Sequence, residues 1–310
     1  MAEIAPILEG DGPALTVVEV GGWPPRLRDF LPGREITVVD VAAGAGPGCA
    51  RAAGTALPFP DRSFDLAASL DTLEHVEPAD RPRFIAELCR VARSCVVVAA
   101  PFAAEAVAAA DRAMLEFIRA QAGYEHPYLK EHVALAPPDL VETLTRLVDG
   151  GLDVQVVPSG RLDRWLFMMA AYYTLDADPA LRPALPFVME AYNRAFYDYD
   201  KAEPAYRHFL VGAYAGLGRR WSRLAELATG PGAEAVDSRS MVMVLELART
   251  LALKVKDREA AALAAQLADK DRELAALTER AAALEDFMVK VKSLPLYSFY
   301  EKFVKPRRPR

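Results

Sequence analysis

Four short, mainly apolar runs rich in β-branched residues recur within the first hundred positions of this chain, at residues 16–20, 36–39, 64–70 and 95–100. Runs that are apolar at consecutive positions, rather than at alternate ones, are typical of parallel strands covered on both faces. Between the last two runs, residues 81–93 place apolar side chains at helical spacing. Strands that alternate with helices predict an α/β fold with a doubly wound, mostly parallel sheet.

Beyond Pro101 the predicted strands are separated by longer helical stretches. We expect helical insertions at about residues 102–138 and 160–200, and two more strands at residues 152–157 and 207–214. Together these elements predict one Rossmann-like domain over residues 1–228.

The composition changes after a Gly-, Ala- and Pro-containing stretch, residues 229–239, which we interpret as a linker. Residues 240–292 contain neither Gly nor Pro, and mainly apolar residues repeat every seven positions in two sets that lie three positions apart. The first set is Leu267, Leu274, Ala281 and Met288, and the second is Leu263, Lys270, Leu277, Leu284 and Val291. The repeat predicts a long C-terminal coiled-coil helix and therefore a homo-oligomer. The alternative is a single amphipathic helix on the domain, but a length of roughly 75 Å exceeds what such a domain can cover.

The last segment, residues 293–310, combines aromatic side chains with the terminal basic residues Lys305, Arg307, Arg308 and Arg310. This composition is typical of an interfacial anchor and predicts peripheral membrane contact through the tail. A disordered, solubilising end is the alternative interpretation.

The overall charge and hydropathy restrict the partners and the compartment. A net charge of −6 argues against nucleic acid as a partner. No apolar run approaches the roughly 20 residues that cross a bilayer, and the first residues do not resemble a signal peptide. We therefore expect a cytoplasmic protein, peripheral at the inner face of the membrane if the tail is an anchor. The three cysteines form no disulfide framework.

The turn after the first strand and the end of the second carry a pattern that suits a nucleotide-like ligand. Gly21 and Gly22 follow the first strand, where glycine lets the backbone approach a ligand closely. Asp40 ends the second strand about 20 positions later. A carboxylate there offers two acceptor oxygens to the two hydroxyls of a ribose.

Two further motifs are more specific. Residues 57–65 are LPFPDRSFD, and residues 69–75 are SLDTLEH. Over residues 16–101, and in outline to about 215, the chain resembles the class I S-adenosylmethionine-dependent methyltransferases of the type 11-like group, which act on small molecules, lipids and sugars. The resemblance implies a methyltransferase whose cofactor is S-adenosylmethionine. It implies cofactor-binding roles for Glu19, Gly21, Gly22, Asp40, Leu57 and Asp71.

The sequence departs from this family at the glycine-rich turn. Trp23 and Pro25 stand where the family has its second and third glycines, and Ala53 and Gly54 replace an acidic residue that often meets the adenine. Two alternatives to an active enzyme therefore stay open. One is a catalytically degenerate methyltransferase fold that serves as a coiled-coil scaffold or recruits partners, and the other is a chiefly structural coiled-coil protein.

Methyl transfer to a hydroxyl needs a base, and histidine titrates in the useful range. His75, His126 and His132 all follow strands at the expected carboxyl edge of the sheet, and they are our candidates for the general base. With Asp71 and Glu131 the same histidines could be interpreted as metal ligands. No His-x-x-x-His or Glu-x-x-His spacing supports that interpretation, so we expect no metal site.

The acceptor is constrained only by composition. Residues 197–200 are YDYD, and the helices around them are rich in Trp, Tyr and Phe. Rings beside carboxylates suit a polyhydroxyl compound. We expect transfer to oxygen on a small molecule, a sugar or a lipid-linked glycan, for instance a surface polysaccharide; the alternative for the rings is an ordinary core.

Overall fold

The structure is a computed structural model that describes residues 1, 3–10, 12–44, 46–214, 219–228, 238–293 and 302. By its contacts the chain divides into two compact units, Met1–Ala248 and Arg249–Arg310.

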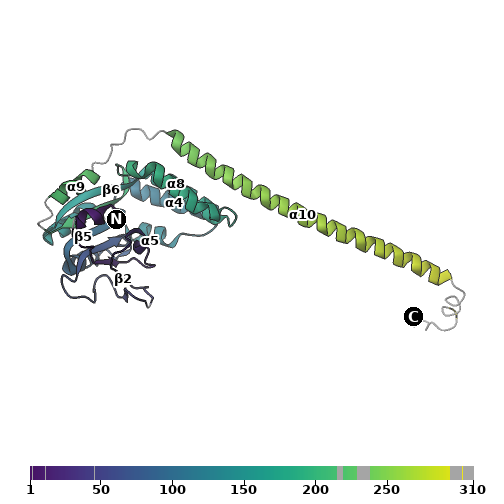
Figure 1. The fold of residues 1–310 in the computed structure, drawn as a ribbon, viewed down its shortest axis with the longest axis horizontal. Helices are drawn as coiled ribbons and strands as arrows, with labels where there is room; N and C mark the ends of the chain where they lie inside the picture. The colour runs from purple at the N-terminus through teal and green to yellow at the C-terminus, as the bar shows by residue number, and fades with distance from the viewer. Residues whose placement is uncertain are drawn as a thin grey trace. The chain divides into compact units, whose positions relative to one another are not determined.

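The first unit contains a seven-stranded sheet with the strand order β3-β2-β1-β4-β5-β7-β6 (Figure 1). The strands are β1 (Val17–Val20), β2 (Ile36–Asp40), β3 (Cys49–Arg51), β4 (Phe64–Leu70), β5 (Ala92–Ala100), β6 (Asp153–Arg161) and β7 (Ala205–Ala213). The first five run parallel, whereas β7 is antiparallel to both β5 and β6. The chain order reverses between β1 and β4, which is where ligands bind in sheets of this kind.

Helices cover both faces of the sheet because the strands are apolar on both sides. On one face, α3 (Arg81–Val91) and α6 (Leu140–Asp149) bury Ile85, Leu88 and Leu147 against the strands. On the other face lie α1 (Ile4–Glu9), α2 (Leu27–Phe30) and α9 (Arg219–Ala228), with a separate core. The doubly wound, mostly parallel α/β fold that the sequence predicts is therefore confirmed.

A further helical layer is formed by α4 (Glu105–Ala122), α5 (Pro127–Leu135), α7 (Leu162–Ala177) and α8 (Leu185–Phe196) (Figure 1). Three short 3-10 turns complete the unit: η1 (Leu73–His75), η2 (Arg182–Ala184) and η3 (Tyr197–Tyr199). Side chains of α4, α5 and α7 share a core of their own with Tyr206 of β7. This core fixes α5 beside the strand ends, so helical side chains reach the same edge as the strand turns.

Some elements differ from the sequence prediction. The three-residue strand β3 was not predicted, because it is too short to form an apolar run. The helices α1 and α2 were also missed, since each offers less than two turns of periodic sequence. Strand β6 continues four residues beyond the predicted end, through Pro158 and Gly160, and β7 begins two residues before the predicted start.

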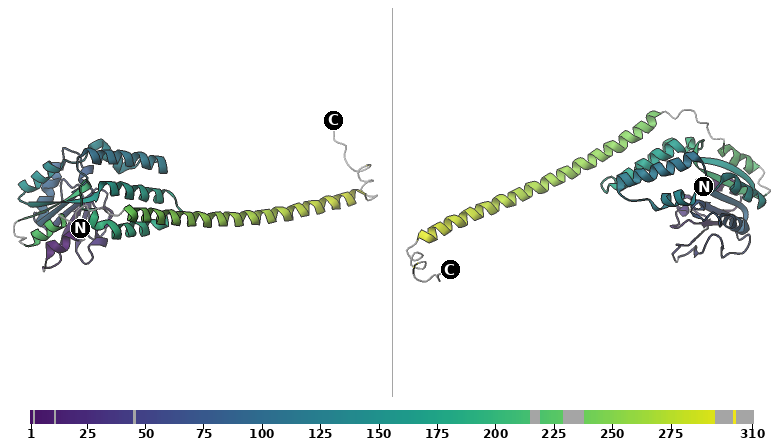
Figure 2. Two further views of the ribbon diagram at one scale, coloured as in Figure 1. Left: turned by 90° about the horizontal axis from the view of Figure 1, so that it is seen from above. Right: turned by 180° about the vertical axis from the view of Figure 1, so that it is seen from behind.

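The long C-terminal helix is confirmed as α10 (Ser238–Ser293), which Figure 2 shows as one uninterrupted helix. At 1.5 Å per residue, its 56 residues extend over roughly 84 Å. Most of the predicted linker, and the predicted tail apart from residues 293 and 302, lie outside the described residues. Among the residues that the structure describes, no helix meets the length and hydropathy needed to span a bilayer.

Candidate active site

A cavity of about 920 Å³ lies beyond the carboxyl ends of β1, β2 and β4. Gly21, Asp40 and Asp71 line it from the strand turns. Side chains of α5, α7 and β7 line the opposite wall, including His132, Trp165 and Tyr206. The cavity therefore joins the predicted cofactor side to the helical layer.

Gly21 is held where only glycine fits. Its φ of +85° is one that other residues rarely adopt, and a Cβ there would lie 2.2 Å from a side-chain carbon of Thr72. The Gly21 amide donates to the carbonyl of Val39. The turns after β1, β2 and β4 are thus packed closely enough that Gly21 presents backbone, not side chain, to the cavity.

Asp40 is the last residue of β2 and lines the same cavity. Its Oδ1 accepts from the Ala42 amide at 2.7 Å, and its Oδ2 accepts from the Trp23 amide at 3.3 Å. These two bonds orient the carboxylate while leaving further lone pairs on each oxygen. Trp23, which replaces a family glycine, itself lines the cavity.

Three of the residues predicted to bind cofactor do not line the cavity. Glu19 is buried behind the turn, and a Cβ on Gly22 would lie 2.1 Å from its Cδ. Burial raises the pKa of Glu19 to about 7, and its Oε2 has no hydrogen-bond partner among the described residues. The Leu57 side chain belongs to the core, while its carbonyl accepts from Arg90. Glu19, Gly22 and Leu57 therefore support the turns that line the cavity without lining it themselves.

Asp71 also lines the cavity, immediately after β4. Its φ of 50° is left-handed, and its Oδ2 accepts from Arg207 of β7. This ion pair ties the turn after β4 to the antiparallel strand β7.

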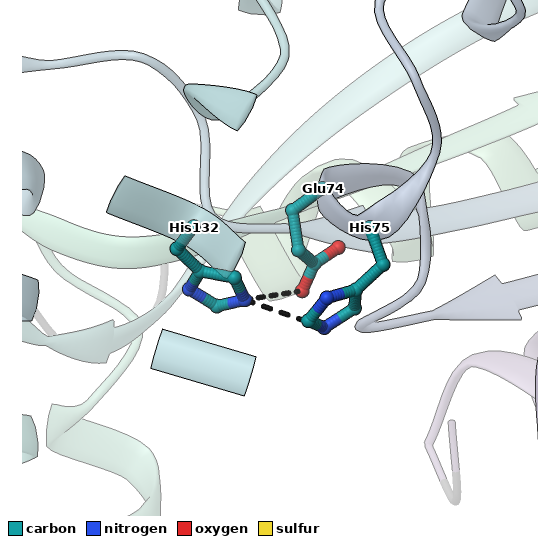
Figure 3. A group of neighbouring side chains, drawn as sticks. All are labelled: Glu74, His75 and His132. Atoms are coloured by element: carbon teal, nitrogen blue, oxygen red, sulfur yellow. Dashed lines mark hydrogen bonds and ion pairs between the residues drawn. The ribbon is translucent and has the colours of Figure 1, made fainter. Parts of the chain in front are cut away.

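His75 and His132 meet in the cavity wall, with their Nε2 atoms 3.3 Å apart (Figure 3). Each ring also bonds a carboxylate through Nδ1: His75 to Glu131 Oε2 at 2.8 Å, and His132 to Asp111 Oδ2 at 3.3 Å. A carboxylate only accepts, so both Nδ1 atoms donate and both Nε2 atoms face the shared space. Burial, followed by the charge of His132, lowers the pKa of His75.

Glu74 lies beside this pair, and the sequence analysis did not select it. Its side chain is 1% exposed, and Oε1 lies 3.8 Å from His132 Nε2. Burial, with the charge of Asp71, raises the pKa of Glu74 to about 8. Its Oε2 has no hydrogen-bond partner within the described part of the chain. Glu74 belongs to the SLDTLEH motif, but the motif alone assigns no role to its side chain, so it was not among the predicted site residues.

The third candidate, His126, lines the cavity but serves a different local role. It is the N-cap of α5, and its Nδ1 accepts from the Leu129 amide at 3.4 Å. The neutral ring therefore carries its proton on Nε2. His208, the remaining histidine, bonds Glu203 at 2.7 Å and is not among the residues lining this cavity.

Only part of the aromatic cluster lines the cavity. Trp165 stacks on Tyr206 with ring centroids 3.5 Å apart, and both line the cavity with Tyr173. Tyr197 and Asp200 of the YDYD segment instead border a second cavity of about 350 Å³. The side chain of Asp198 lies outside the described residues. The buried acid of this wall, Asp111 of α4, was not predicted, because in the sequence it is one charged residue in an Ala-rich helical stretch.

One comparison, with protein-family models, agrees with the motifs. Residues 33–100 match a family model described as a methyltransferase domain. No curated protein matches the chain. Similar solved structures include the YcgJ protein from Bacillus subtilis (12% identity, 65% of this chain and 92% of that one, TM-score 0.38). Another is magnesium protoporphyrin IX methyltransferase from Synechocystis, with 12% identity over 69% of this chain and 81% of that one and a TM-score of 0.39. A third is a possible histamine N-methyltransferase from Thermotoga maritima, with 13% identity over 68% of this chain and 86% of that one and a TM-score of 0.39.

The matched residues span β2 to β5 and include the ends of β2 and β4, whose turns line the cavity. The match thus indicates a methyltransferase domain on these strands. Residues 33–100 carry a methyltransferase domain, an enzyme domain, and the LPFPDRSFD and SLDTLEH motifs within it are those of the class I group, whose cofactor is S-adenosylmethionine.

Glu19 yields a prediction about stability and pH. Its pKa rises from 4.5 to about 7 on folding, so the unfolded chain ionises first as pH increases. The fold therefore loses stability between about pH 4.5 and 7. Glu19→Gln should raise the free energy of unfolding at pH 8 by about 1–3 kcal/mol and change little at pH 4. Denaturant unfolding at both pH values measures this, with Glu116→Gln on the exposed face of α4 as the control. Equal effects of Glu19→Gln at both pH values would contradict the assignment.

Proposed function

We propose that this protein transfers a methyl group from S-adenosylmethionine to an oxygen of a polyhydroxyl acceptor: a small molecule, a sugar or a lipid-linked glycan. The observation that carries the proposal is the single cavity that contains Asp40 and Gly21 at one end and the His75–His132 pair at the other. Cofactor and acceptor would meet in this cavity. The sulfonium methyl is already activated, so alignment and proton removal are what remain to be supplied.

Support for the cofactor side comes from the strand turns. Asp40 has free lone pairs for the ribose hydroxyls, and Gly21 allows close approach of the methionine part. Ala53, Gly54 and Thr55 line the cavity near β3, where an adenine would lie. Small residues there leave room for a ring, and Trp23 offers an aromatic face in place of the missing glycines.

Support for a base comes from the tautomers. His75 donates Nδ1–H to Glu131, which leaves the Nε2 lone pair toward the cavity. Its lowered pKa keeps the ring neutral at pH 7, the form that accepts a proton. His132 has the same arrangement through Asp111. His126 presents Nε2–H instead, so we assign it to donating a hydrogen bond to the acceptor and place proton removal at the His75–His132 pair.

Support for a polyhydroxyl acceptor comes from the wall beyond the histidines. Tyr128, Trp165 and Tyr173 line it, together with Glu131 and the Asp71–Arg207 pair. Rings that stack on a sugar face beside groups that bond hydroxyls are the chemistry of carbohydrate recognition.

The cofactor assignment predicts that Asp40→Ala weakens binding of S-adenosylmethionine by about 1.5–3 kcal/mol, the value of a charged hydrogen-bond partner. Calorimetry with S-adenosylmethionine and with its demethylated product measures the change. Asp29→Ala, an exposed carboxylate on α2, is the matched control. Unchanged affinity in Asp40→Ala would remove this residue from the site. Failure of the wild-type protein to bind either compound would favour the degenerate scaffold.

The base assignment predicts that His75→Gln lowers turnover on an identified acceptor by roughly 10²–10⁴-fold while cofactor affinity is retained. In the wild type, turnover should fall as pH decreases through the pKa of His75, which lies below the ordinary value, because protonation fills the Nε2 lone pair. His208→Gln serves as the control outside the cavity. Full turnover in single Gln variants of His75, His126 and His132 would show that alignment alone suffices.

For the long helix we propose self-association as a coiled coil. Leu263, Leu267, Leu274, Leu277 and Leu284 are each at least 60% exposed in the single chain, and all lie on the two heptad positions. Such a stripe is buried when a second copy pairs with it. Two copies would also bring two aromatic and basic tails to an anionic membrane surface, where two weak contacts bind far better than one.

The coiled coil predicts that Leu274→Lys with Leu277→Lys converts a full-length oligomer to a monomer, because both charges enter the seam. Ala275→Lys with Ala276→Lys adds the same charge outside the seam and should leave the oligomer intact. Light scattering separates the two results, and sedimentation with anionic liposomes should show weaker recovery of the seam variant only. A monomeric wild-type protein would refute the coiled coil, and equal liposome recovery of both variants would refute the contribution of paired tails.

A further inference from the structure

We propose that Glu74, His75 and His132 bind a divalent transition-metal cation, such as Zn²⁺, at the wall of the cavity (Figure 3). The binding itself does not depend on the proposed methyl transfer.

The distances suit one cation. One ligand atom from each residue can be chosen so that all three lie within 4.8 Å of one another. The two Nε2 atoms are 3.3 Å apart, and Glu74 Oε1 lies 3.8 Å from His132 Nε2. Tetrahedral zinc with bonds of about 2.0–2.2 Å places its ligand atoms about 3.3–3.6 Å apart. Small side-chain rotations therefore complete the triangle without moving the backbone.

The hydrogen bonds around the two histidines prepare them as ligands. In metal sites, the ring nitrogen that does not bind metal usually donates to a carboxylate, which fixes the tautomer and the orientation of the ring. Here His75 donates to Glu131 and His132 donates to Asp111. Asp111 is itself held by the Tyr206 hydroxyl at 2.7 Å. Both Nε2 lone pairs consequently point at each other across 3.3 Å, an arrangement that repels unless a cation or a proton lies between them.

Glu74 supplies an independent observation. Its carboxyl is fully buried, yet Oε2 has no partner among the described residues, and burying an unpaired polar oxygen is costly. The side chain points at the two imidazoles (Figure 3), and only 1% of it is exposed. A bound cation would compensate for this burial, since carboxylate and imidazole are both ordinary zinc ligands.

Three protein ligands leave a fourth position open, which is typical of a catalytic and not a structural zinc site. All three ligands line the cavity, so that position faces the space assigned to the acceptor. If the proposed function is correct, the acceptor hydroxyl would occupy it, and the cation would lower the pKa of that hydroxyl. His75 and His132 would then be ligands and not bases; the hydroxyl proton would pass to solvent, and its oxygen would take the methyl group while the sulfonium becomes a neutral thioether.

Calorimetric titration of the chelator-treated full-length protein with Zn²⁺ and with Co²⁺ tests the site. We expect one equivalent to bind, and Co²⁺ to show the visible absorption of a tetrahedral site with nitrogen and oxygen ligands. Glu74→Gln, His75→Gln and His132→Gln should each weaken binding by about 100-fold or more, and Asp111→Asn by about 10-fold. His126→Gln, in the same cavity, and His208→Gln should bind as the wild type does. Circular dichroism shows which variants remain folded.

Several results would overturn the proposal. These are no binding at millimolar metal, binding unaffected by Glu74→Gln and His132→Gln, or loss in His126→Gln alone. A proton shared by His75 and His132 in the nitrogen NMR spectrum, unchanged by added metal, would also overturn it. Titration of the same samples with S-adenosylmethionine separates the two proposals. If the protein binds S-adenosylmethionine but no metal, the metal site alone is refuted. If it binds metal but no S-adenosylmethionine, only the methyltransferase function is refuted.

Discussion

The parallel pairing of β2, β1 and β4 determines where the rest of the site lies. Parallel strands end at one edge, so the turns after Val20, Asp40 and Leu70 must meet there. The contact of Gly21 with Thr72 shows how close this meeting is, since no room for a Cβ remains. A side chain at position 21 would separate β1 from β4, and with it Asp40 from η1. The turn that carries Asp40 and the turn that carries His75 therefore depend on one steric constraint.

The sequence predicted this edge well because its signal is local. A β-branched run followed by Gly21, and another that ends at Asp40, each specify a strand and its end. The histidines were also placed correctly on the edge, since His75 follows a strand directly. What the sequence could not predict is which histidines meet. His75 and His132 are separated by 57 positions, and only the packing of α4, α5 and α7 around Tyr206 brings them together.

The prediction that the chain has no metal site relied on the spacing of ligands within one helix. The group formed by Glu74, His75 and His132 does not have that spacing, because its members come from two different elements. Glu74 and His75 are neighbours in a turn, while His132 comes from α5. The assignment of Leu57 and Glu19 to cofactor contact had a related weakness. A motif identifies residues that accompany a function, but Leu57 acts by filling the core, and Glu19 by packing behind the Gly21–Gly22 turn. The motif contains both the residues that line the cavity and those that support it.

The buried acids concentrate around this edge, and their locations are informative. Glu19, Glu74 and Asp111 are each at most 5% exposed, and burial of an acid normally destabilises a fold. Asp111 is satisfied by Tyr206 and His132, whereas Glu19 and Glu74 each keep an unpaired oxygen. Both unsatisfied carboxyls thus lie near this edge of the sheet, but Glu74 lines the cavity whereas Glu19 lies behind it. Local conflict of this kind is expected at functional sites, because the missing partner arrives with the ligand.

One imidazole nitrogen cannot hold a proton and a cation together, so the His75–His132 pair has two exclusive chemical states. Without a cation it is a base whose free Nε2 lone pair takes the proton of an acceptor hydroxyl, and Glu131 and Asp111 stabilise the positive charge that results. With a cation it is a ligand set, and the same two carboxylates strengthen the bond to metal. The surrounding hydrogen bonds serve both states equally. Glu74 differs from these two carboxylates: it bonds neither Nδ1 atom, and its unpaired oxygen lies on the Nε2 side, where it completes a cation site. This asymmetry favours the ligand state as the one that the site is built to hold.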